Sequence, residues 1–154
     1  QFQDRSVTKE YLALTAGIPD PQEAVIDAPI GRHATARTTM SVTQVSAARD
    51  AKTGYKVLAT SKSIALVLCH LFTGRTHQVR VHLSAIGYPI LGDGTYGTDA
   101  SNRLTQENGI EGLMLHAWKL SFESPTGKKV EVKAGLPQTW KDCLKKLGVK
   151  LPGA

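Results

Sequence analysis

The sequence of 154 residues contains little cysteine, with Cys69 and Cys143 as its two examples. They lie far apart, and neither belongs to a CxxC motif or to a cluster of cysteine and histidine. This usage argues against a structural zinc site and against a disulfide framework. We therefore expect no metal, and we expect an intracellular, reducing compartment: the cytoplasm or an organelle such as the mitochondrion.

Long hydrophobic runs are also missing. No apolar stretch approaches the roughly 20 residues of a membrane-spanning helix, and the first residues, Gln1 to Arg5, do not resemble a signal peptide. The sequence has no GxxxxGK[ST] or GxGxxG phosphate loop, no GxSxG elbow and no HExxH pair. These absences predict no cofactor and no membrane partner, and they give hydrolase chemistry no support.

Basic charge is present in excess, with 19 Lys and Arg against 13 Asp and Glu and a formal net charge of +6. Most of the excess follows Trp118. A basic domain suits an anionic partner, most commonly nucleic acid, and Lys128 and Lys129 are candidates for phosphate contact. The alternative is a solvated face that only keeps the protein soluble. A hydrophobic content of 41% is typical of one globular domain covering residues 1–154.

Alternating apolar and polar residues predict strands at 7–14, 39–45 and 55–59. The apolar run 64–72 predicts a buried strand. A strand hairpin is expected from 113–122 and 129–134, which flank a Ser-Pro-Thr-Gly turn.

Two helices are predicted after these strands. Thr76 can cap the first, which carries an apolar stripe and stops before Gly87. Thr139 can cap the second, whose stripe begins at Trp140. The polar stretch up to Gly112 is expected to be a loop or a short helix. Together with the strands, these elements predict an α+β fold.

The densest polar cluster, Thr-Gly-Arg-Thr-His-Gln-Val-Arg-Val-His at 73–82, lies at a junction of strand and helix. Arg80 flanks the apolar stripe, so its guanidinium could hold a partly buried carboxylate; an ordinary solvated arginine is the alternative. His77 and His82 are expected on different helix faces, which argues against a metal. His116, in an apolar strand, is interpreted as a core histidine.

These residues resemble a known family. Residues 71–83, together with Gly-Tyr-Pro-Ile-Leu-Gly-Asp at 87–93 and Tyr-Gly at 96–97, resemble the GRTHQIRVHL and GHPIxGDxxYG signature of RluA-type RNA pseudouridine synthases. Shorter similarities cover the F-x-x-R-x-V-x-K-x-Y strand at 2–11, the I-x-R-x-x-x-x-R stretch at 30–37 and the LLLHA strand at 113–117.

The resemblance implies a mixed, mostly antiparallel sheet flanked by helices, with a cleft across its middle. It also implies that uridine in structured RNA, such as rRNA or tRNA, is isomerised to pseudouridine without cofactor or metal. By position, Tyr11 is the tyrosine that stacks on the target base, and Arg80 is the arginine paired with the catalytic aspartate.

Other basic residues in the matching motifs are expected to contact RNA. Arg32 and Arg37 belong to the 30–37 stretch. Arg75 and His77 precede Arg80 and are expected either to shape the turn or to meet the RNA.

One departure from the family pattern is serious. The family's nucleophile is the Asp of a His-Arg-Leu-Asp motif that comes well before the K-x-Y strand, whereas none of the seven aspartates here follows Arg-Leu. We therefore expect these residues to form the C-terminal portion of a catalytic domain, without the nucleophile and the anionic partner of Arg80, and inactive alone. An intact relative that has lost catalysis and serves as an RNA-binding or ribosome-assembly factor is the alternative.

Overall fold

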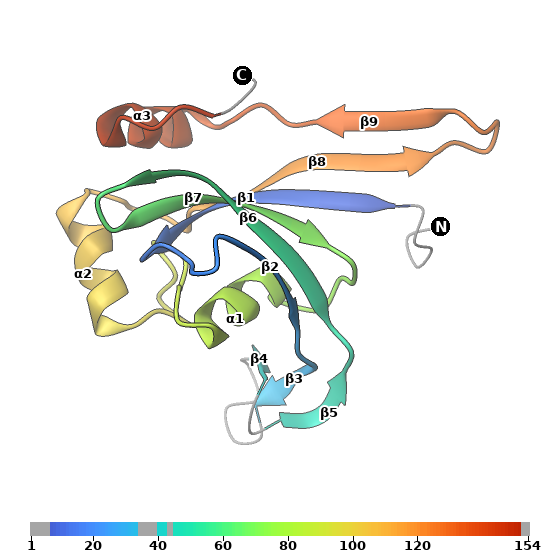
Figure 1. Ribbon diagram of the computed structural model, residues 1–154, viewed down its shortest axis with the longest axis horizontal. Coiled ribbons are helices and arrows are strands. Elements are labelled where there is room, and N and C mark those ends of the chain that lie inside the picture. Colours follow the sequence, from blue (N-terminus) through green and yellow to red (C-terminus); the bar gives the residue numbers. More distant parts are fainter. Residues whose placement is uncertain (1–6, 34–39, 43–44, 152–154) are drawn as a thin grey trace.

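A six-stranded antiparallel sheet forms the body of the protein in a computed structural model, which describes residues 7–33, 40–42 and 45–151 (Figure 1). From one edge to the other, its strands are β2 (Glu23–Asp27), β6 (Lys52–Ser61), β7 (Ile64–Leu71), β1 (Thr8–Ala16), β8 (Leu115–Glu123) and β9 (Lys129–Lys133). All strand pairs of the described ranges are antiparallel. The expected α+β class with a mostly antiparallel sheet is confirmed.

A second, three-stranded sheet lies below the first in the view of Figure 1 and is called the small sheet. It contains β3 (Ile30–His33), β4 (Met40–Ser41) and β5 (Val45–Arg49). The helices of the described ranges are α1 (Gln78–Ala85), α2 (Asp99–Glu107) and α3 (Gln138–Leu147).

Helices α1 and α3 cover opposite faces of the large sheet (Figure 1). Thr53 of β6 pairs with Leu71 of β7, which pairs with Lys9 of β1, so these three side chains lie on one face. The Thr53 hydroxyl bonds to His82 of α1, so this is the face that α1 covers. Because alternate residues of a strand share a face, Tyr11 lies on this α1 face as well. On the opposite face, the ring of His116 lies 6.2 Å from that of Trp140 in α3.

Burial on both faces explains the continuous apolar runs at the centre of the sheet. Leu12, Ala13 and Leu14 follow one another in β1 and are all 0% exposed, which requires cover on both sides. Burying each such leucine stabilises the fold by about 1.5–3 kcal/mol. The predicted strands at 7–14, 55–59 and 64–72 are confirmed as parts of β1, β6 and β7.

A β-bulge interrupts β8 opposite β1. Ala117 pairs with Tyr11 and Lys119 pairs with Glu10, so Trp118 is the extra residue. The indole of Trp118 attracts Lys119, at 4.3 Å from Nζ to the ring centre, and Lys133 of β9, at 4.9 Å. Two lysines that are direct cross-strand neighbours would repel each other, and the shared aromatic face offsets that repulsion.

The helix starts differ from the sequence predictions. Helix α1 begins after His77, and α3 begins after Pro137, and no side chain caps the N-terminus of either helix. The predicted caps Thr76 and Thr139 are therefore wrong. The cap positions are held by His77, in a left-handed conformation, and by Pro137 instead. The expected hairpin is confirmed as β8 and β9, and the stretch before Gly112 contains α2.

Other strand predictions are met in part. The predicted strand at 39–45 is divided between β4 and β5, with residues 34–39 and 43–44 outside the described residues. Strands β2 and β3 have no counterpart among the predictions, because their short sequences hold too few apolar residues to display a period.

Among the histidines whose burial is described, His82 is fully buried, whereas His116, expected to be a core histidine, remains partly exposed. The Nε2 of His82 lies 2.8 Å from the carbonyl oxygen of Ala28, so this nitrogen carries the proton, and Nδ1 accepts from the Thr53 hydroxyl at 2.8 Å. Gln78, one helical turn earlier, donates to the same hydroxyl at 2.9 Å. This network joins α1 to β6 and to the segment after β2.

Burial lowers the pKa of His82 from its ordinary value of 6.5, and this effect exceeds the opposing influence of the Ala28 carbonyl. Because the unfolded chain takes up a proton near pH 6.5 while the folded protein resists it, we expect stability to fall as the pH decreases below about 6.5. Urea unfolding at several pH values measures this. His82→Gln, which can keep both hydrogen bonds without titrating, should flatten the pH dependence; an equally steep dependence in this variant would contradict the assignment.

Candidate functional site

The site is built around an ion pair between α1 and the turn that follows it. Arg80 donates from Nε to Asp93 Oδ2 at 2.9 Å and from Nη2 to Oδ1 at 3.0 Å, the parallel geometry of a bidentate pair. The Asp93 side chain is 0% exposed, whereas that of Arg80 is 18% exposed. The carboxylate is therefore enclosed by protein, and the arginine side chain is partly exposed.

Glycine shapes the turn that delivers Asp93. Gly92 has a φ of +81°, and a Cβ there would collide with the carbonyl of Gly112. Only glycine fits this close approach of two backbone segments. Asp93 then accepts from the backbone N–H groups of Thr95 and Tyr96, each at 3.1 Å to Oδ1.

Asp93 stays ionised in spite of its burial. Burial alone would raise the pKa of its carboxyl group, but hydrogen bonds from Arg80, Tyr96 and Thr95 outweigh that effect and hold the pKa below its ordinary value. The same hydrogen bond to Asp93 raises the pKa of Arg80. The site therefore keeps a permanent cation whose position is fixed by an internal anion.

This pair corrects one expectation. We expected the anionic partner of Arg80 to be absent from these residues, but Asp93 fills that role. Sequence reasoning assigned Asp93 only to a turn, because a contact across 13 positions leaves no local signal. Enclosed by its hydrogen bonds, Asp93 cannot approach a substrate atom. The Nη1 group of Arg80 is not needed for the pair and can bind a further acceptor.

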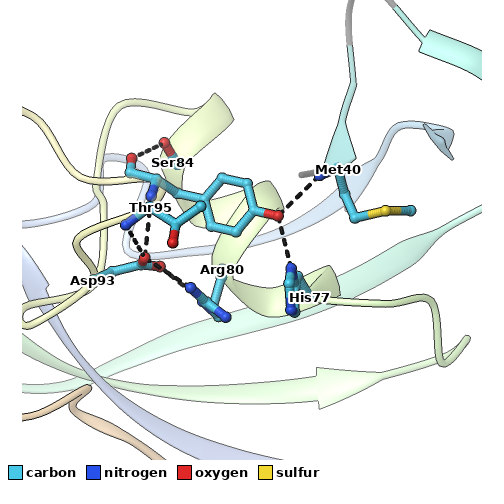
Figure 2. A network of polar contacts seen from close by, with 7 residues as sticks. Met40, His77, Arg80, Ser84, Asp93 and Thr95 are labelled. Atoms are coloured by element: carbon cyan, nitrogen blue, oxygen red, sulfur yellow. Dashed lines mark hydrogen bonds and ion pairs between the residues drawn. The ribbon is translucent and has the colours of Figure 1, made fainter. Parts of the chain in front are cut away.

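Tyr96 connects this pair to two other segments, as Figure 2 shows around Met40 and His77. Its hydroxyl accepts from the backbone N–H of Met40 at 2.9 Å and lies 2.7 Å from His77 Nδ1. The Arg80 guanidinium carbon lies 5.0 Å from the centre of the Tyr96 ring. A single side chain thus contacts the small sheet, the start of α1 and the arginine.

His77 begins α1 in the left-handed conformation, with φ 55° and ψ 24°. For a residue other than glycine this conformation costs about 1–2 kcal/mol, and the contact with Tyr96 helps to offset the cost. Burial, followed by the charge of Arg80, lowers the pKa of His77. A neutral imidazole can accept at Nδ1, so we assign the phenol proton to that hydrogen bond.

Besides His77, two of the predicted RNA-binding residues lie near the site. Arg32 is exposed on β3 and pairs with Met40 of the neighbouring strand β4. The backbone N–H of Met40 is the group that donates to the Tyr96 hydroxyl. Arg75 is fixed before α1 by its Nε bond to the Asp50 carbonyl at 2.7 Å. Both lie on segments that contact the site.

The remaining predicted residues are not brought to this centre by the described contacts. Lys128 and Lys129 are exposed at the tip of the β8–β9 hairpin, far from α1 in Figure 1. Arg37 lies outside the described residues. RNA contact by each of these residues stays a prediction.

Tyr11 occupies the middle of the α1 face of the large sheet. Its partners are Cys69 of β7, which is 0% exposed, and Ala117 of β8, which is exposed. Ala117 places only a small side chain beside the tyrosine, which is itself partly exposed. This position is compatible with a ring that stacks on a base.

The described residues contain no group of three or more histidine, cysteine, aspartate and glutamate side chains arranged to hold a metal ion. Within the same ranges, no helix has the length and apolar character needed to cross a membrane. Cys69 and Cys143 are both free.

Comparison with known proteins identifies the family of this chain. The family model of RNA pseudouridylate synthase matches residues 1–85. The chain is 40% identical over 145 residues to an uncharacterised RNA pseudouridine synthase of Mycobacterium bovis, covering 94% of this chain and 46% of that protein. It is 40% identical over 141 residues to the ribosomal large subunit pseudouridine synthase D of Zymomonas mobilis, covering 90% and 44% respectively.

A solved structure is also similar. The human RNA pseudouridylate synthase domain containing 4 superimposes with a TM-score of 0.78 at 31% identity, covering 99% of this chain and 66% of that one. The chain belongs to the RNA pseudouridylate synthase family, and within it to the RluA type. It spans slightly less than half the length of the curated relatives given above.

The hydroxyl of Tyr96 provides a test of this arrangement. Tyr96→Phe keeps the ring beside Arg80 and removes the bonds to Met40 and His77, so we expect a loss of about 1–2 kcal/mol in the free energy of unfolding. Amide hydrogen exchange at Met40 should become faster. Tyr88→Phe is the matched control, since it removes a hydroxyl that accepts from Asp20 at 3.3 Å at an exposed position. Equal exchange at Met40 in both variants would contradict the role of Tyr96.

Proposed function

We propose that this chain is the C-terminal portion of the catalytic domain of an RNA pseudouridine synthase. The whole protein isomerises uridine to pseudouridine in structured RNA, which includes rRNA and tRNA as candidates. The carrying observation is the partly exposed side chain of Arg80, fixed by Asp93 on the helix that covers the sheet face of Tyr11. Family membership supports the reaction class.

In this proposal the RNA presents a uridine taken out of its stack, since a base inside a folded RNA offers no access to its glycosidic bond. The bond from the sugar to the uracil nitrogen breaks, and a bond from the sugar to carbon 5 of the same uracil forms. Carbon 5 loses its proton, and the released nitrogen takes up a proton. The product is an isomer of the substrate, so the reaction calls for no external reagent.

Arg80 acts on the reacting carboxylate rather than on the RNA backbone. A second aspartate, supplied by a segment of the protein outside the 154 residues, would meet the Nη1 group that Asp93 leaves available. A fixed cation favours the ionised form of that aspartate in a cleft where burial would otherwise protonate it. Without that segment, the 154 residues bind but do not turn over substrate.

Tyr11 holds the extruded uracil by stacking. Aromatic stacking contributes about 1–3 kcal/mol per base, and the small side chain of Ala117 beside the tyrosine leaves room for the base. The phenol hydroxyl is the candidate for proton removal from carbon 5. With both thiols free, we further propose a reducing intracellular compartment, the cytoplasm or an organelle such as the mitochondrion.

A second candidate function is an RNA-binding or ribosome-assembly factor of the same fold that does not catalyse. One observation favours it: the aspartate that pairs with Arg80 is enclosed and so cannot act as the nucleophile. The residues encoded upstream distinguish the two candidates. His-Arg-Leu-Asp before the β1 strand supports the enzyme, and its absence supports the binding factor.

For Arg80, we expect Arg80→Met in the full-length protein to abolish turnover and to lower the free energy of unfolding by about 3 kcal/mol, because Asp93 is left buried and unpaired. Arg80→Lys should recover little, since an ammonium group lacks the planar fork. Single-turnover formation of pseudouridine and urea unfolding measure the two effects.

A double variant separates structure from chemistry. Arg80→Met with Asp93→Asn removes the orphaned charge while keeping an acceptor for the Thr95 and Tyr96 N–H groups, so stability should return in part. Turnover should stay absent. If turnover returned together with stability, Arg80 would be a structural residue only.

For Tyr11, two substitutions distinguish stacking from proton transfer. Tyr11→Phe keeps the ring, so RNA binding should be normal while product formation stops if the hydroxyl removes the proton. Tyr11→Ala should weaken binding by about tenfold as well, through loss of stacking. RNA gel shifts and pseudouridine mapping check these results. An alanine variant that binds and reacts like the parent would make Tyr11 a strand residue without a role in the reaction.

A further inference from the structure

A cleft of about 970 Å³ opens where the start of β1, the end of β7 and the loop before α1 meet. Phe72 forms part of its wall and is 53% exposed. A folded domain usually buries a phenylalanine, and a large aromatic ring left exposed in a cleft is typical of a binding surface. The site described above gives this ring no role.

The Phe72 ring is held in place from behind. A Cβ on Gly54 of β6 would lie 3.3 Å from Phe72 Cε2, so the missing side chain of the glycine provides the seat for the ring. His70 packs against the same ring, with centroids 4.8 Å apart and an interplanar angle of 54°. Supported by two neighbours, the ring is pre-organised, and little conformational entropy is lost when a flat ligand binds to it.

Cations accompany the ring. Lys52 Nζ lies 5.7 Å from the centre of Phe72, and Arg75 lines the same cleft. Asp27 and Asp50 line it as well, so the cleft carries both signs of charge. An aromatic platform with nearby cations suits a ligand that combines a planar ring with an anionic backbone, which describes a nucleotide.

The cleft adjoins the proposed active site. Lys9 lines it, and Tyr11 follows Lys9 by two positions, so both lie on the α1 face. On the other side, a Cβ on Gly74 would lie 3.7 Å from Lys9 Nζ, which joins the loop before α1 to β1. The Phe72 ring itself, seated on Gly54 and His70, lies on the opposite face of the sheet, because these residues alternate with Thr53 and Leu71. The cleft thus lies at the strand ends, where the two faces of the sheet meet.

We propose that Phe72 is a stacking platform for an unpaired base of the bound RNA outside the active site, with Lys52 and Arg75 near its phosphate. This subsite rests on the proposed function, because it assumes RNA as the substrate. Its contribution is to the affinity for unpaired RNA rather than to the chemical step.

The test measures binding of a short, fluorescein-labelled single-stranded oligouridylate to the full-length protein by anisotropy. A second probe has the same sugar-phosphate backbone without bases. Phe72→Ala should weaken binding of the oligouridylate about tenfold and leave binding of the abasic probe unchanged. Phe72→Trp should restore binding, because it returns an aromatic face.

Val132→Ala is the matched control, since Val132 is 52% exposed and lies on β9, away from the cleft. It should bind both probes like the parent. Oligouridylate binding by Phe72→Ala that equals the parent, or a loss that is the same for the abasic probe, would overturn the subsite. Because no turnover is measured, a protein that makes no pseudouridine yet shows the Phe72 dependence would contradict the proposed function and leave the subsite standing.

Discussion

A buried carboxylate determines how this site is assembled. Taking a charge out of water is costly unless every oxygen finds a donor, and Asp93 meets that demand with Arg80 and two backbone amides of its own turn. Satisfying one anion thus fixes the turn, aligns the helix that carries Arg80 and brings the Tyr96 ring beside the guanidinium. The arginine is oriented before any substrate arrives, so a reacting carboxylate would meet a group already in position.

Helix α1 serves two purposes through two faces. Gln78 and His82 point to the large sheet, where a chain of hydrogen bonds through Thr53 fixes the helix to β6. His77, Arg80 and Ser84 meet the turn after Asp93 instead. The dense run of polar residues at 73–82 is therefore mostly structural, and only part of it is available to a ligand. This division also explains how a short helix can hold a charged site steady beside an open cleft.

Strands with strong periodicity could be predicted from the sequence, and so could the hairpin and the position of α1. Residues 64–72 show why: an apolar run of that length, with few helix signals, predicts a buried strand. The helix caps failed, since His77 adopts a left-handed backbone that no local rule anticipates. The sequence predicted that Arg80 could hold a partly buried carboxylate, and the bidentate pair confirms this. That Asp93 is the partner, and the contacts of Tyr96, were missed because they join segments distant in sequence. The roles of Tyr11 and Arg80 in the reaction stay predictions.

The bulge at Trp118 lets β8 carry one residue more than β1 without losing its register. Before it, Ala117 shares a face with Tyr11; after it, Leu120 shares that same face with Lys9. Deleting Trp118 would leave Lys119 opposite Glu10 and Leu120 opposite Lys9 in an unbroken ladder, so the later side chains would keep their faces. The loss would instead be the indole, and Lys119 and Lys133 would remain as like charges directly opposite each other. The extra residue of β8 is therefore a partner for two lysines rather than a spacer of the strand.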